Sequence, residues 1–226
     1  MAGLYVLTSI DGQTLPAATP LPTAFGACVP RVLYGDLSVV RQINRTYPLY
    51  TIVIATWPQV PPSSCTNRFG AALPEDLVRD GGRWTGDNSG LRFASQLGAG
   101  TYDVQVGNVN GSPTLTAAVR GHTMVFQRAM TAADEPVGID VNVFDPAGGR
   151  VPRSVVAVSQ RGLVVYRAME LGNGFVWTVS RGAPLTFTVT PPPGYAVAPG
   201  QPASVTVTPT PDQRTVDVRF VLAPTP

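Results

Sequence analysis

The side chains that carry most protein chemistry are scarce in this chain of 226 residues: it has no lysine, one histidine and two cysteines. Amines, imidazoles and thiolates are the usual nucleophiles, general bases and metal ligands. His122 falls in an expected hairpin, with no cysteine or second histidine near it in the sequence, whereas a metal site needs several ligands. We therefore interpret His122 as a turn residue and predict no metal ion and no cofactor.

Serine and carboxylate chemistry is also weakly supported. Any Ser-His-Asp arrangement would have to use His122, and the sequence contains no G-x-S-x-G nucleophile elbow. The acidic pairs 75–76 and 134–135, together with Asp80 and Asp87 in the expected turns 80–82 and 87–90, remain candidates for acid–base work, and the segment 87–89 for a weak calcium loop. Adjacent acids in loops are usually solvated, and the ligand spacing of an EF-hand is missing. The sequence therefore predicts a protein that is not an enzyme.

The two cysteines suggest a disulfide. Two strand-like runs, 32–42 and 49–57, lie between them. If these runs form an antiparallel hairpin that turns near 44–47, paired residue numbers sum to about 91–93, and Cys28 and Cys65 sum to 93. The alternative is two unpaired small hydrophobic side chains. A disulfide implies an oxidising compartment, so we predict a periplasmic or cell-surface protein whose leader is not in this chain.

Composition excludes several classes of protein. Charged residues make up 13% of the chain, roughly half the usual share, and 16 arginines nearly balance 14 carboxylates. No run of like charge appears, which argues against nucleic-acid binding, and no apolar run is long enough to cross a membrane. A GC-rich genome would explain arginine in place of lysine. The low total charge favours a chain buried in a larger assembly.

Alternation of apolar and polar residues dominates the chain. One short helix is expected at 74–79, where a proline precedes acids. Turn sequences separate eight expected strands in the first half, the count of a small antiparallel barrel or a related sandwich. These strands are 4–10, 32–42, 49–57, 83–85, 91–95, 101–107, 115–120 and 122–128.

The composition breaks at 131–136, which we interpret as a linker between a domain of residues 1–130 and a domain of residues 137–226. Seven strands are expected in the second domain, a number typical of an immunoglobulin-like β-sandwich. They are 137–143, 154–159, 163–169, 175–180, 185–190, 204–208 and 215–222. The Pro-rich tail that follows cannot continue a ladder.

Each half resembles a known kind of domain. Residues 3–16, G-L-Y-V-L-T-S-I-D-G-Q-T-L-P, resemble the opening of lipocalin-like β-barrel domains of exported bacterial proteins, and 100–104 and 121–126 fit the same pattern. This likeness covers about residues 3–128 and carries no catalytic residues.

Residues 135–223 resemble carboxypeptidase regulatory-like and prealbumin-like sandwich modules, through V-N-V-F-D-P-A-G at 141–148 and P-P-P-G-Y at 191–195. Related adhesin domains use a Lys–Asn isopeptide bond, which a chain without lysine cannot form. The resemblance implies a spacer or docking surface.

Aromatic residues supply the candidates for partner binding, because interface hot spots favour Trp, Tyr and Arg. The alternative is that they cover the ends of the core. The candidates are Trp57, Pro58, Tyr195, Trp84 and Trp177.

These observations predict a non-enzymatic, exported structural or docking subunit that binds a protein partner in a larger envelope or membrane-anchored complex. A photosynthetic reaction-centre and light-harvesting assembly is one host considered, although no residue specifies it. The first alternative is a carrier that holds a small apolar ligand inside the barrel. The large residues expected to face inward favour a filled barrel instead: Leu37, Val39, Ile52, Ile54, Phe93, Val104 and Phe126. The second alternative is an adhesin or carbohydrate-binding module.

Overall fold

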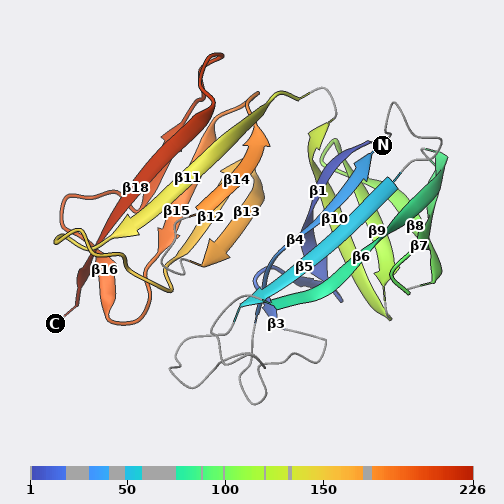
Figure 1. Ribbon diagram of the computed structural model, residues 1–226, viewed down its shortest axis with the longest axis horizontal. Coiled ribbons are helices and arrows are strands. Elements are labelled where there is room, and N and C mark those ends of the chain that lie inside the picture. Colours follow the sequence, from blue (N-terminus) through green and yellow to red (C-terminus); the bar gives the residue numbers. More distant parts are fainter. Residues whose placement is uncertain are drawn as a thin grey trace. The chain divides into compact units, whose positions relative to one another are not determined.

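The structure, a computed structural model, describes residues 2–18, 31–40, 49–57, 75–87, 89–98, 100–119, 121–131, 134–169 and 175–225. Every regular element in these ranges is a β-strand (Figure 1). In the same ranges no helix has the length and apolar character needed to cross a membrane. The chain divides into two compact units, one holding the described residues up to Thr131 and the other those from Asp134 onward.

The first unit is a closed, eight-stranded antiparallel barrel, as the strand count predicted. Its sheet closes because β1 pairs with β10 on one side and with β4 on the other. Short strands β2 (Gln13–Thr14) and β3 (Ala17–Ala18) extend it at β1 and β4. The barrel strands are β1 (Gly3–Ile10), β4 (Arg31–Val40), β5 (Leu49–Trp57), β6 (Glu75–Asp87), β7 (Gly90–Ser95), β8 (Thr101–Val109), β9 (Ser112–Val119) and β10 (His122–Thr131).

The helix expected at 74–79 is wrong. Residues from Glu75 onward belong to strand β6, which pairs with β5 from Thr56↔Glu75 to Leu49↔Arg83. A proline followed by acids is only a local signal for a helix start. Pairing along the full length of a neighbouring strand outweighs it, because intrinsic propensity is a weak preference that tertiary context overrides.

The expected hairpin between 32–42 and 49–57 exists as β4 and β5, but its register differs. Leu37 pairs with Ile52 and Arg31 with Trp57, so paired numbers sum to 89 and 88 rather than 91–93. A slip of two residues leaves every side chain on its own face, so alternation alone does not distinguish these registers. Cys28 and Cys65 lie outside the described residues. Their disulfide stays a prediction, now without the register that suggested it.

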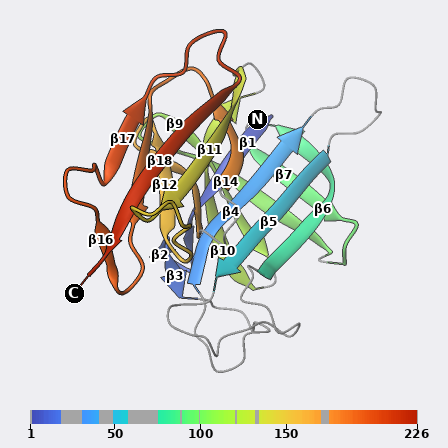
Figure 2. The ribbon, with the colours of Figure 1, turned by 60° about the vertical axis from the view of Figure 1, so that its left-hand side comes forward.

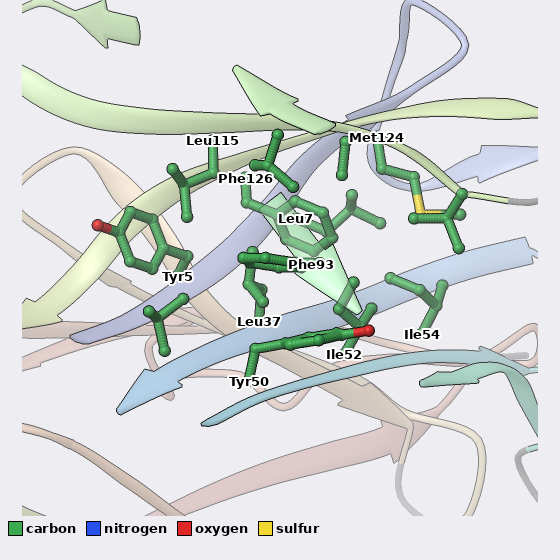
Figure 3. Close-up of a cluster of buried hydrophobic side chains, with 14 of the residues drawn as sticks. Tyr5, Leu7, Leu37, Tyr50, Ile52, Ile54, Phe93, Leu115, Met124 and Phe126 are labelled. Atoms are coloured by element: carbon green, nitrogen blue, oxygen red, sulfur yellow. The ribbon is translucent and has the colours of Figure 1, made fainter. Parts of the chain in front are cut away.

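Side chains fill the interior of the barrel. All seven residues expected to face inward are at most 1% exposed. Figure 3 shows Leu37, Ile52, Ile54, Phe93 and Phe126 among the packed side chains, with the Phe93 ring lying over the ring of Tyr50. The two ring centroids are 4.0 Å apart and the planes are 21° from parallel. Close packing of this kind stabilises the barrel through buried apolar area.

The second unit contains two four-stranded sheets (Figures 1 and 2). One has the order β14-β11-β18-β16, in which β11 and β18 run parallel, and the other the order β13-β12-β15-β17. The strands are β11 (Pro136–Phe144), β12 (Val155–Gln160), β13 (Leu163–Met169), β14 (Phe175–Ser180), β15 (Leu185–Thr190), β16 (Tyr195–Val197), β17 (Ser204–Val207) and β18 (Thr215–Pro224).

Each of these sheets has one buried face. Along β11 every second residue from Val137 to Val143 is buried, and β18 and β15 alternate in the same way. The seven expected strands are all present. The eighth, β16, was missed because three residues after a run of prolines do not show an alternating pattern.

We predict that Gly82→Ala destabilises the barrel while Gly90→Ala does not. A Cβ added at Gly82 would overlap the backbone carbonyl oxygen of Ala94, whereas at Gly90 the nearest atom would be 4.0 Å away. Overpacking of this kind costs about 1–3 kcal/mol. Urea unfolding of the two variants measures the difference. Equal free energies of unfolding for both would contradict this packing.

Candidate functional site

A buried polar cluster lies inside the barrel, centred on the carboxylate of Asp80 in β6. Asp80 is 1% exposed and is the one charged residue buried among the described side chains. One carboxylate oxygen, Oδ2, accepts hydrogen bonds from the hydroxyls of Tyr50 at 2.8 Å and Tyr102 at 2.7 Å. The other, Oδ1, accepts one from Ser95 Oγ at 2.5 Å. The carboxylate therefore joins four consecutive strands, β5 to β8.

The surroundings of the cluster keep both tyrosines in their protonated, donating form. Burial is the main cause that raises the pKa of Tyr50 and of Tyr102 well above the ordinary 10.0, and the neighbouring carboxylate adds to it in each case. The ring of Tyr102 meets the edges of Tyr50 and Phe93 at centroid distances of 6.2 and 5.8 Å. Since every hydroxyl donates to Asp80, the cluster satisfies a buried charge and holds four strands together.

Sequence reasoning named Asp80 as a candidate acid but expected residues 80–82 to form a turn, so it missed the hydrogen-bond partners of Asp80. The structure places these residues in the middle of β6, where Asp80 pairs with Ile52 and Gly82 with Tyr50. The available signal was alternation: Asp80 and Gly82 stand two residues apart on the same face as Trp84, and all three are buried. An inward acid in a strand requires hydrogen-bond donors on neighbouring strands.

A second polar contact joins the turn after β1 to the start of β10. One oxygen of Asp11 lies 2.7 Å from Nδ1 of His122, and the other accepts the backbone N–H of Thr123 at 2.9 Å. The Asp11 N–H in turn donates to the Thr123 carbonyl at 2.8 Å. The hydrogen bond from His122, followed by the one from Thr123, lowers the pKa of Asp11. His122 is the first residue of β10 rather than part of a turn, and its contact with Asp11 fastens the turn after β1 to this strand.

The five partner-binding candidates do not come together. Trp84 is 2% exposed and its Nε1 donates to the carbonyl of Val40 at 3.3 Å, so it belongs to the core of the barrel and offers no surface. Trp57 and Trp177 lie on β5 and β14, but their side chains, like Pro58, lie outside the described residues. Tyr195, half-buried at the start of β16, is the candidate that the structure places on a surface.

One edge of the second unit lacks charged residues over a long segment. From residue 182 to residue 211 the sequence contains no Asp, Glu, Arg or His, and this segment forms β15, β16 and β17 with their connections. Strands β16 and β17 are edge strands of the two sheets. We call residues 182–211 the uncharged edge.

The uncharged edge carries rows of exposed hydroxyls in place of charges. Thr186 and Thr206 place their Oγ1 atoms 3.0 Å apart, and Thr188 and Ser204 place their hydroxyl oxygens 3.2 Å apart. These cross-strand pairs connect β15 to β17 on the outer face of their sheet. They give a polar surface without formal charge, which binds water less tightly than charged side chains would.

Comparisons with known proteins add no relative: no family model, no curated protein and no solved structure matches this chain. Within the described residues no group of three or more His, Cys, Asp or Glu side chains lies close enough together to hold a metal ion.

Raised tyrosine pKa values make the barrel sensitive to alkaline pH. The unfolded chain ionises tyrosine near pH 10, while folded Tyr50 and Tyr102 stay protonated to higher pH. Their contribution to stability is therefore complete below pH 10 and is lost as the pH rises above it. We expect Tyr102→Phe to lower stability by about 1–2 kcal/mol at neutral pH and to flatten the alkaline decline. Thermal unfolding from neutral to alkaline pH measures both effects.

Tyr195→Phe, at a tyrosine outside the cluster, is the control and should retain the alkaline slope of the wild type. An unchanged slope in Tyr102→Phe would show that the cluster does not hold its tyrosines protonated.

The contact of Asp11 with His122 makes the stability of the barrel depend on pH at the acidic end of the range. Because its pKa is lowered in the fold, Asp11 stabilises the barrel above the unfolded value of 3.8, and this stabilisation is lost as the pH falls through the folded value. We expect Asp11→Asn to be less stable than wild type at neutral pH and to lose less stability on acidification. Denaturant unfolding at several pH values tests this, with Asp103→Asn on the exposed face of β8 as the control.

Proposed function

We propose that this chain is a non-enzymatic structural or docking subunit that binds a protein partner within a larger envelope or membrane-anchored complex. The observation that carries the proposal is the uncharged edge. Strand edges expose unpaired N–H and C=O groups, and proteins commonly protect such edges with charged side chains. Here the edge strands β16 and β17 lack charge, and half-buried Tyr195 stands at the start of one of them.

The packing of the barrel supports a structural role over the alternative of a ligand carrier. An eight-stranded barrel holds a small ligand only when its interior is not filled by side chains. The interior of this barrel contains the fully buried rings of Tyr5, Tyr50, Phe93 and Phe126. The buried acid Asp80 already accepts three hydrogen bonds, so a ligand would have to displace well-packed groups.

The finer family assignments and the cellular location are part of the same proposal. A closed antiparallel barrel supports a lipocalin-like first unit. Two four-stranded sheets, each with one buried face, support an immunoglobulin-like or prealbumin-like sandwich over residues 137–226. A periplasmic or cell-surface location is proposed because the predicted disulfide between Cys28 and Cys65 would need an oxidising compartment. An adhesin or carbohydrate-binding role would call for a flat row of exposed aromatic rings, and Tyr195 is the one candidate ring placed on the surface of the second unit among the described side chains.

One substitution, made at two exposed glutamines, tests the docking role. Gln201→Glu places a charge on the uncharged edge, and Gln105→Glu places the same charge on the outside of β8. After cross-linking in intact cells, we expect envelope proteins to co-purify with the wild type and Gln105→Glu. Recovery with Gln201→Glu should fall several-fold, because charge is disfavoured in the centre of an interface.

Circular dichroism and thermal unfolding confirm that both variants are folded. If the wild type purifies as a monodisperse protein with no envelope protein attached, or if both variants recover the same partners, the docking proposal fails.

A further inference from the structure

One edge of β17 directs its backbone hydrogen-bonding groups away from the sheet. In antiparallel pairs, alternate residues exchange both of their backbone hydrogen bonds with the partner strand. The N–H of Val189 donates to the carbonyl of Ala203 at 3.0 Å, and the register continues in steps of two to Phe187↔Val205 and Leu185↔Val207. Val205 and Val207 therefore bond to β15. The N–H and C=O groups of Ser204 and Thr206, which lie between them, are directed away from β15.

This edge lacks the usual protection against strand addition. Among the described strands β17 pairs with β15 alone, and both Ser204 and Thr206 are exposed. No charged side chain stands on it, and the two prolines that flank it, Pro202 and Pro209, limit its length without blocking its centre. The side chains of Val205 and Val207, on the inner face, are only half-buried. A strand added here would cover them.

We propose that β17 pairs edge to edge with β17 of a second copy of this chain. Two identical strands pair antiparallel about a two-fold axis, which is the most common symmetry of protein dimers. With the axis at Val205, each Ser204 lies opposite Thr206 of the other copy, and these pairs exchange the backbone hydrogen bonds that each copy directs outward. The sheet β13-β12-β15-β17 then continues across the axis into the same sheet of the second copy.

The side chains of β17 complement themselves in this arrangement. Because side chains alternate between faces, valine meets valine on the inner face and hydroxyl meets hydroxyl on the outer face. A second copy always brings the same charges as the first, and like charges placed opposite one another destabilise a pair of strands. An edge with no charge is therefore the kind of edge that permits self-pairing. An uncharged edge therefore suits a second copy of the chain better than a partner that binds through opposite charge.

The small size of the contact sets the expected affinity. β17 contains four residues, so the pair buries far less than the roughly 1,200 Å² typical of stable complexes. We expect a weak dimer with a dissociation constant between about 10 μM and 1 mM, so that association depends on protein concentration. Local enrichment within an assembly would favour the dimer. The inference does not depend on the proposed function.

Sedimentation velocity over this range of concentration tests the pairing. In the wild type, the weight-average sedimentation coefficient should rise with concentration. Thr206→Pro removes a backbone N–H that does not bond to β15, so the fold is retained while the open edge loses a hydrogen-bond donor. We expect association of this variant to weaken about tenfold or more. Thr206→Val keeps the N–H and the strand shape, and should associate like the wild type.

A second variant covers the case in which proline disturbs the strand. Thr206→Lys leaves the backbone unrestricted and places a positive charge next to the two-fold axis, so association should weaken and should recover partly at high salt. A wild type that remains monomeric up to about 1 mM would overturn the proposal. So would association that is unchanged in both Thr206→Pro and Thr206→Lys. Neither result would decide whether the chain binds envelope proteins, because that test uses Gln201→Glu and measures co-purification after cross-linking.

Discussion

Backbone hydrogen bonding at the edges of strands is the constraint on which this structure depends. A strand satisfies its N–H and C=O groups on both sides only if it has a neighbour on each side. In the first unit this condition is met by closure, because β1 pairs with both β10 and β4. In the second unit two separate sheets leave edge strands, β16 and β17 among them. The two units therefore differ in what they can offer to another molecule.

Closure also determines what lies inside the barrel. Eight strands enclose a space that side chains can fill, and here aromatic and aliphatic residues from all the walls fill it. Asp80, the one buried acid among the described residues, is tolerated because three hydroxyls from three other strands donate to it. Because the donors come from different strands, the cluster favours one specific arrangement of β5 to β8.

Much of this fold could be predicted from the sequence, and the errors have physical causes. Alternation identified seven barrel strands, residues 83–85 of β6, and the inward positions from Leu37 to Phe126, because a half-buried strand requires a period of two. It did not fix the register of β4 with β5, since a slip of two residues preserves both faces. Nor did local signals at 74–79 predict β6, whose conformation depends on pairing with β5, distant in the sequence.

The candidate sites were harder to predict because they depend on position within a strand and on strand register rather than on residue type. Residue type suggested Trp84 as a partner anchor, but its position in the alternation of β6 buries it, and the same alternation would have revealed Asp80. The open backbone groups of Ser204 and Thr206 have no signature in residue type at all. These groups are open because Val205 and Val207, rather than Ser204 and Thr206, bond to β15, and the register of the two strands determines this.

The distribution of charge argues that the uncharged edge is more than a consequence of composition. A chain with few charged residues could simply have few everywhere. In the same unit, however, the outer faces of β11 and β18 carry Asp140, Asp217 and Arg219. Charge is thus present where a sheet face meets water and absent along β15 to β17, where an edge is open. Because charge is what most simply prevents strand addition, an edge without charge is open to pairing with another strand.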